Sequence, residues 1–210
     1  MLILGMQKLV VLEMPKTGSL ALRAMLAPYT LPASDRAARH IGYDGFLRNH
    51  APHLAAGFGI TPQTVVVVRD PLERMQSWYR YRRRAKVKGL PASTHGISFE
   101  TFICAYLDGI NPEMSNVGRQ DRFVGWNGRS ARVDHVFDYA QLNVLEAFFS
   151  RRMGTTLTLP QRNKTPKGVE ADYTLSKDAL ARFQEQNLAE IELYHAVAGA
   201  GHLMRPGIFA

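Results

Sequence analysis

The sequence has very little cysteine and no long apolar segment, and both features narrow the choice of protein class. Cys104 is the only cysteine among 210 residues, which excludes a disulfide within the chain and a cysteine-rich metal site. No apolar run reaches the roughly 20 residues of a membrane-spanning helix. Residues 1–6 are too short for the apolar part of a secretion signal. We therefore expect one soluble, cytoplasmic domain covering residues 1–210.

Acidic residues are scarce relative to basic ones, with 18 against 26 and a formal net charge of +8. Residues 80–88 hold six basic residues and no acidic one, so this segment accounts for most of the excess. A nucleic-acid-binding protein usually has a broad basic face. The concentration in one segment favours a local anion-binding surface or the solvated end of a helix, and we expect no nucleic acid partner.

Short apolar runs alternate with helical patterns, which predicts an α/β fold with a central, mainly parallel sheet flanked by helices. The four valines within residues 64–69 predict a strand buried on both faces, and shorter strands are expected at residues 9–14 and 133–137. Asp70, Ser98 and Asp138 are expected to cap helices. The expected helices cover residues 20–27, 71–84, 98–108, 139–153 and 176–198, with loops and short elements at 40–53 and 111–132 and a tail at 199–210.

The junction between the first strand and helix has the composition of an anion-binding loop. Lys16, Thr17, Gly18 and Ser19 combine an ammonium group, two hydroxyls and a flexible glycine at a helix N-terminus, where backbone N–H groups are free. The GxxxxGK[ST] pattern of a Walker A loop is absent, because Lys16 precedes Gly18. This loop alone is equally compatible with a phosphate site and with an ordinary turn that exposes a lysine.

A second junction has the same character. Arg69 ends the valine-rich strand, and Arg74 and Ser77 share one face of the following helix. A guanidinium and a hydroxyl beside a helix N-terminus form a phosphate site. Because parallel strands place their carboxyl ends at one edge of a sheet, Lys16 and Arg69 are expected at the same edge. The alternative is that Arg69 pairs with Asp70 or another carboxylate and that Ser77 is an ordinary surface residue.

Together, residues 15–19 (PKTGS) and 69–77 (RDPLERMQS) resemble the paired signature of sulfotransferases that use 3′-phosphoadenosine 5′-phosphosulfate. Residues 98–102, 116–120, 136–139 and 159–164 resemble segments of the carbohydrate-type branch of that family. The resemblance implies a P-loop-NTPase-like three-layer fold. The residues that it implies for binding the nucleotide are Lys16, Thr17, Gly18, Ser19, Leu20, Ala21, Arg69 and Ser77. Leu20 departs from the family, which commonly has Thr or Ser at this position.

The resemblance also implies the reaction, which is sulfuryl transfer to a hydroxyl or amine of a carbohydrate or glycolipid without a metal. Lys16 would neutralise the charge that develops on the bridging oxygen. His50, preferred slightly, and His53 are candidate general bases, because relatives often place a histidine between the two motifs. Glu13 and His40 are less favoured, and His135 lies in an apolar strand that suggests a structural role. The implied substrate contacts are Arg119, Gln120, Arg162, Asn163 and Lys164.

Three other functions remain open at this point. An ATP-dependent kinase would also use two phosphate sites, but the Walker order and an evident magnesium-binding acid are lacking. A non-catalytic binder of nucleic acid or acidic glycans would use residues 80–88. An inactive relative of the sulfotransferases is compatible with the departure at Leu20.

Overall fold

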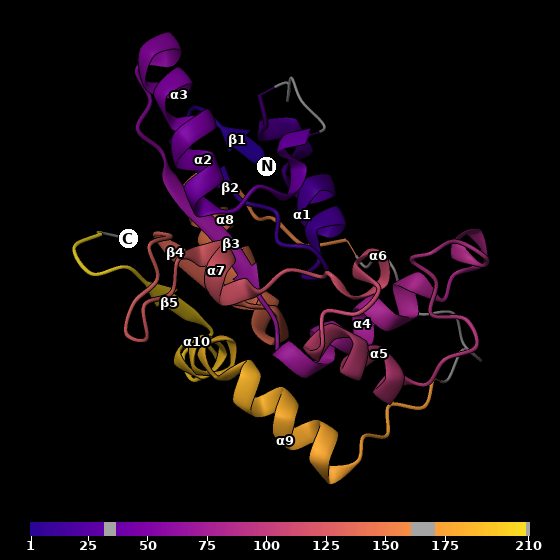
Figure 1. The fold of residues 1–210 in the computed structure, drawn as a ribbon. Coiled ribbons are helices and arrows are strands. Elements are labelled where there is room, and N and C mark those ends of the chain that lie inside the picture. Colours follow the sequence, from indigo (N-terminus) through magenta and orange to yellow (C-terminus); the bar gives the residue numbers. More distant parts are fainter. Residues whose placement is uncertain (32–36, 161–170, 209–210) are drawn as a thin grey trace.

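The computed structural model describes residues 1–31, 37–160 and 171–208 and contains one five-stranded mixed sheet with helices around it (Figure 1). The strands follow the same order in the chain and in the sheet: β1 (Leu2–Leu4), β2 (Leu9–Val11), β3 (Gln63–Val68), β4 (His135–Asp138) and β5 (His202–Met204). Strands β2, β3 and β4 are parallel, whereas β1 and β5 pair antiparallel with their neighbours. The α/β class and a parallel centre are confirmed, and the two antiparallel edges make the sheet mixed.

Helices occupy most of the connections between the strands. The described α-helices are α1 (Ser19–Leu26), α2 (Tyr43–Asn49), α3 (Ala51–Phe58), α4 (Pro71–Arg82), α5 (Phe99–Leu107), α6 (Pro112–Ser115), α7 (Gln120–Val124), α8 (Leu142–Met153), α9 (Lys177–Gln186) and α10 (Leu188–Ala198). Short 3₁₀ turns are η1 (Ala27–Tyr29), η2 (Ala37–His40), η3 (Ala85–Val87) and η4 (Tyr139–Gln141).

The three predicted caps are confirmed. The Asp70 carboxylate accepts a hydrogen bond from the Glu73 N–H at 2.8 Å, and Ser98 Oγ accepts one from the Thr101 N–H at 3.0 Å. Asp138 accepts one from the Ala140 N–H at 2.9 Å, at the start of the turn that leads into α8. These local signals fix where α4, α5 and the turn η4 begin, while α8 starts three residues later at Leu142 without a side-chain cap.

One other expectation holds in part and two are wrong. Residues 40–53, expected as loops with short elements, do contain short elements, but α2 and α3 leave little loop between them, and Phe46 and Leu54 of these helices are buried in the core. The predicted helix 176–198 is interrupted at Asn187, whose buried side chain accepts a hydrogen bond from Tyr106 Oη at 2.6 Å. The expected tail after residue 198 contains β5, which completes the sheet.

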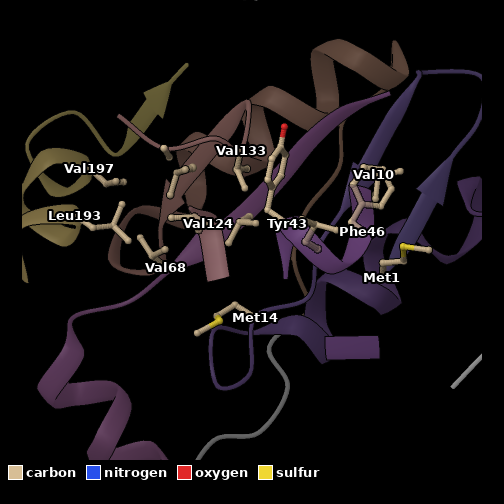
Figure 2. Close-up of a cluster of buried hydrophobic side chains, with 14 of the residues drawn as sticks. Met1, Val10, Met14, Tyr43, Phe46, Val68, Val124, Val133, Leu193 and Val197 are labelled. Carbon is tan, nitrogen blue, oxygen red and sulfur yellow. The ribbon is translucent and has the colours of Figure 1, made fainter. Parts of the chain in front are cut away.

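Apolar side chains of the central strands alternate between two faces, and helices cover both. One face packs against α2, α7 and α10 (Figure 2). The opposite face packs against α1 and α8. This arrangement is compatible with three layers. The first cluster includes Met1, Val10, Leu12, Met14, Tyr43, Phe46, Val66, Val68, Val124, Val136, Leu193 and Val197, and the second includes Leu9, Val11, Leu22, Leu26, Val65, Val67, Phe137, Leu145 and Phe149.

A third apolar cluster joins α4, α5 and α9, which extend beyond the carboxyl edge of the central strands (Figure 1). A buried ion pair fixes α4 to the rest of the protein, because Arg74 Nη2 lies 3.2 Å from Glu190 Oε1 of α10. The same guanidinium donates hydrogen bonds to the backbone oxygens of Val117 and Gly118. Both terminal nitrogens of Arg74 are thus engaged within the protein, whereas its buried Nε has no hydrogen-bond partner among the described residues.

Two histidines face each other across β4 and β5. His135 Nδ1 lies 3.2 Å from His202 Nε2, and His135 Nε2 lies 3.2 Å from Gln63 Oε1. Burial and, to a smaller extent, the charge of His202 lower the pKa of His135 to about 4. The structural role expected for His135 fits these contacts.

Acid should weaken the fold through this pair. Because the pKa of His135 in the folded protein lies below the ordinary histidine value of 6.5, protonation favours the unfolded chain as the pH falls from 6.5 to about 4. The free energy of unfolding should fall in this window by up to about 1.4 kcal/mol per pH unit. Urea unfolding at pH 7, 6 and 5 should show a weaker pH dependence in His135→Phe than in the wild type. Equal dependences would contradict this assignment.

Candidate functional site

The segments that follow β2, β3 and β4 meet at Tyr139. A Cβ atom placed on Gly18, in the loop after β2, would lie 3.1 Å from Tyr139 Cε2. The guanidinium of Arg69, directly after β3, lies over the same ring, with Cζ 4.6 Å from the ring centroid. Tyr139 itself follows β4. The structure therefore brings the first loop and Arg69 to one edge of the sheet. This is the edge expected from the carboxyl ends of parallel strands.

Lys16 has a strained backbone and an ammonium group that faces α4. Its φ angle of 72° lies in the left-handed region, which residues other than glycine rarely adopt. Lys16 Nζ lies 4.2 Å from the ring centroid of Tyr81 and 5.6 Å from that of Trp78. On the strand side, Met14 is buried in the core (Figure 2) and its carbonyl oxygen accepts a hydrogen bond from Thr17 Oγ1 at 2.9 Å. Strain that the surrounding structure enforces in this way is typical of functional sites.

The surroundings of Lys16 are cationic. Burial, followed by the charges of Arg84, Arg80, Arg69 and Arg82 in that order, lowers the pKa of Lys16 to about 7. Within the residues that the structure describes, no carboxylate forms an ion pair with this ammonium group. Lys16 therefore titrates near neutral pH, and a bound anion would stabilise its charged form.

Two buried donors lie in the same region. Arg82 is 6% exposed, and its Cζ lies 4.9 Å from the ring centroid of Trp78. In the described part of the chain, Arg82 Nη1 and Trp78 Nε1 are buried without a hydrogen-bond partner. Each unsatisfied buried donor costs about 1–3 kcal/mol. Donors of this kind beside Lys16 fit a ligand rich in anionic oxygen atoms.

Arg69 is held at both its backbone and its side chain. Its N–H donates to Gln120 Oε1 at 2.9 Å, and its carbonyl oxygen accepts from Gln120 Nε2 at 2.7 Å. Its guanidinium donates two hydrogen bonds of 3.1 Å to Glu73, whose side chain is largely exposed. Arg69 thus pairs with Glu73, and Asp70 caps α4 instead. An exposed ion pair of this kind contributes about 0–1 kcal/mol, so a phosphate could replace Glu73 at low cost.

The structure corrects several predicted contacts. Gln120 is fully buried and both ends of its amide bind the backbone of Arg69, so it supports Arg69 and is not exposed to a substrate. Arg74 is occupied by Glu190, which leaves Arg69 and Ser77 from the second motif. The Ala21 N–H donates to the Gly18 carbonyl oxygen at 2.9 Å and is not free for a ligand.

The remaining predicted contacts fall in several places. Leu20 is 45% exposed at the start of α1, and Ser19 is the first residue of that helix.

Arg119 pairs with Asp121 through contacts of 2.9 and 3.0 Å and lines a cavity of about 490 Å³. The residues lining this cavity are Tyr106, Asn116, Gly118, Arg119, Arg122, Phe123, Gln186 and Asn187, and neither Lys16 nor Arg69 is among them. Arg162, Asn163 and Lys164 lie outside the described residues.

The two preferred histidines are not brought to Lys16. His53 is exposed on α3, and His50 joins α2 to α3. Figure 1 shows α3 extending away from α4, and the α2–α3 pair borders a cavity that includes Thr64 at the beginning of β3. His40 instead lies beside the segment that leads into the loop, with Nδ1 2.9 Å from the Glu13 carbonyl oxygen. The buried Glu13 carboxylate is occupied by Arg23 and the N-terminal ammonium group.

Trp78 and Tyr139 contribute to the site but are not among the residues predicted from the sequence. Arg82 lies in the basic segment 80–88, but its position beside Trp78 and Lys16 was not predicted. The i, i+4 spacing of Trp78 and Arg82 on a predicted helix was an available signal for a contact between them. Tyr139 could have been found as the residue after the third strand, by the same rule that singled out Arg69.

Replacing Gly18 by alanine should disturb the junction at Tyr139. Gly18 has a φ of 81°, and the added methyl group would meet the Tyr139 ring at 3.1 Å. We expect Gly18→Ala to lower the free energy of unfolding by about 1–2 kcal/mol. Gly57→Ala is a matched control, because a Cβ atom at Gly57 in α3 would meet nothing within 4 Å. Urea unfolding of both variants measures the difference, and equal effects would argue against the close contact.

Comparison with protein-family models, with curated proteins and with solved structures finds no match to this chain. Across residues 1–31, 37–160 and 171–208, none of the helices combines the length and apolar character needed to cross a bilayer. The same residues contain no group of three or more His, Cys, Asp or Glu side chains arranged to hold a metal ion.

Proposed function

We propose that this protein is a sulfotransferase with a P-loop-NTPase-like fold. It would move a sulfuryl group from 3′-phosphoadenosine 5′-phosphosulfate to a hydroxyl or amine of a carbohydrate or glycolipid. The main support is that Lys16 and Arg69 follow adjacent parallel strands, both in contact with aromatic rings at one edge, while the ammonium of Lys16 is surrounded by arginines. Two separate cations at a strand edge suit a ligand with two separate anionic groups.

The donor nucleotide would bind across the two junctions. Its 5′ group would lie against Lys16 and the backbone N–H groups at the start of α1. Ser19 and Leu20 are the best placed, because they precede the helical hydrogen bonds that Ala21 and Leu22 donate to Gly18. Since this contact uses the backbone, a leucine at position 20 is compatible with it. The 3′-phosphate would bind Arg69 and Ser77.

Two buried donors without acceptors among the described residues show whether the residues near Lys16 suit an anionic nucleotide. Arg82 Nη1 and Trp78 Nε1 need acceptors, and both lie close to Lys16 through shared ring contacts. Phosphate and sulfate oxygens are strong acceptors for charged donors. The fit supports an anionic nucleotide.

In the proposed reaction, the acceptor oxygen or nitrogen attacks sulfur, and a new bond forms between them. The bond from sulfur to the bridging oxygen breaks, and adenosine 3′,5′-bisphosphate leaves. Protonated Lys16 would stabilise the negative charge that develops on the bridging oxygen. The acceptor proton passes to a general base, for which we favour His40 over His50 and His53. His40 is fixed to the Glu13 carbonyl oxygen beside the loop, whereas α3 carries His53 away.

Binding of adenosine 3′,5′-bisphosphate is the first test. We expect isothermal titration to show binding that weakens about 10- to 100-fold in Lys16→Ala and in Arg69→Ala, because each loses a charge-assisted contact of about 1.5–3 kcal/mol. Arg48→Ala and Lys177→Ala remove exposed charges on α2 and α9 and should bind as the wild type does. No binding by the wild type would refute the proposal. Tight ATP binding that requires magnesium would favour a kinase.

The pH dependence of the same binding tests the role of Lys16. Its pKa of about 7 in the free protein should rise when an anion binds, because the anion favours the charged form. Affinity should therefore fall as the pH rises above 7, by up to about tenfold per unit until the pKa of the complex is reached. Dissociation constants at pH 6.5, 7.5 and 8.5 measure this change. Lys16→Arg stays charged and should show a flatter profile, whereas identical profiles would contradict the assignment.

A further inference from the structure

A strip of positive charge lies beyond the proposed nucleotide site. No acidic residue occurs between Glu73 and Glu100 in the sequence. Arg83, Arg84, Lys86 and Lys88 are exposed at the end of α4 and in η3, and we call these four residues the basic strip. Within the described residues, none of them forms an ion pair.

Three arginines elsewhere in the described part of the protein form ion pairs at the surface. Arg132 lies 2.5 Å from Asp44, and Arg182 lies 2.6 Å from Asp108. Arg205 similarly pairs with Asp134. Other exposed arginines, such as Arg48 and Arg122, form no ion pair within the described residues either. The basic strip differs from these single charges because it concentrates four unneutralised cations within residues 83–88.

The basic strip is electrostatically continuous with Lys16. Among the neighbouring charges that lower the pKa of Lys16, that of Arg84 has the largest effect, followed by that of Arg80. The two residues also share an aromatic neighbour, because Tyr81 lies 4.7 Å from Arg84 Cζ and 4.2 Å from Lys16 Nζ. A ligand that binds the strip would thus extend toward the ammonium group of Lys16.

The aromatic residues beside the strip are engaged by cations of the protein itself. Tyr81 contacts Lys16 and Arg84, and Trp78 contacts Lys16 and Arg82. Binding of single-stranded nucleic acid relies on aromatic faces that are available to stack with bases. Because cations of the protein already cover these rings, the surface presents positive charge but few aromatic faces for bases to stack on. This favours an acidic carbohydrate over a nucleic acid.

We propose that the acceptor is an acidic carbohydrate chain, which the basic strip binds so that a hydroxyl reaches the sulfur beside Lys16. This inference rests on the proposed sulfotransferase function and specifies its substrate class. Lys16, Arg69 and Arg82 serve the nucleotide, while the strip serves negative charges carried along the acceptor, such as carboxylates or sulfates.

The experiment uses a fluorescently labelled oligomer of galacturonic acid as the probe and measures anisotropy at several salt concentrations. The test variant is K86Q/K88Q, which removes two exposed cations of the strip. The matched control is R48Q/K177Q, which removes the same charge from exposed positions on α2 and α9. We expect the test variant to bind the oligomer about tenfold more weakly, with a shallower salt dependence, and the control to resemble the wild type.

Several outcomes would overturn the inference. Equal weakening in both variants would show that only net charge matters, and a neutral dextran oligomer that binds equally well would exclude charge recognition. Single-stranded RNA that displaces the acidic oligomer and binds more tightly would assign the strip to nucleic acid.

Titration of adenosine 3′,5′-bisphosphate against the same proteins separates the two proposals. K86Q/K88Q should retain nucleotide binding within about twofold, since both residues lie outside the proposed nucleotide contacts. Nucleotide binding without binding of the acidic oligomer would overturn the acceptor proposal alone. Binding of the oligomer without the nucleotide would overturn the sulfotransferase function and leave the strip as a glycan-binding surface.

Discussion

Uncompensated positive charge at the carboxyl edge of the sheet is the constraint on which the proposed site depends. The protein neutralises Arg74 with Glu190 and Arg23 with Glu13, so buried carboxylates are available where the fold needs them. Lys16 and Arg82 have no such partner among the described residues, although both are at least partly buried. Burial disfavours their charged forms. Anionic oxygen atoms of a ligand bound here would neutralise these positive charges, as the protein's own carboxylates neutralise Arg74 and Arg23.

The backbone around these cations is held by contacts that involve no net charge. Gln120 binds both backbone groups of Arg69, and the Thr17 hydroxyl binds the carbonyl oxygen of Met14, which is anchored in the core. Gly18 lies against the Tyr139 ring. The positions of the cations are thus set by neutral hydrogen bonds and packing. Their side chains remain able to exchange weak partners, such as Glu73, for a bound anion.

Much of the fold follows from local signals, and the failures have a physical cause. The valine run and the caps Asp70, Ser98 and Asp138 act within a few residues, so the sequence predicted them. The helices over residues 43–58 and the break at Asn187 depend on tertiary contacts, which periodicity does not reveal. At the site, strand order was sufficient to place Lys16 and Arg69 at one edge. The burial of Gln120 and the place of the histidines depended on how distant segments pack.

Aromatic rings explain how Lys16 and its neighbours Arg82 and Arg84 are held together without carboxylates. Lys16, Arg84 and Arg82 each lie over Tyr81 or Trp78, at 4.2–4.9 Å for the nearest contact of each. A cation–π contact contributes about 0.5–2 kcal/mol, which partly offsets the repulsion among these charges. An ion pair with a buried carboxylate would hold the cations more firmly but would have to be broken before an anion could bind. Because the rings hold the cations without supplying a negative charge, the electrostatic attraction for an incoming anion is retained.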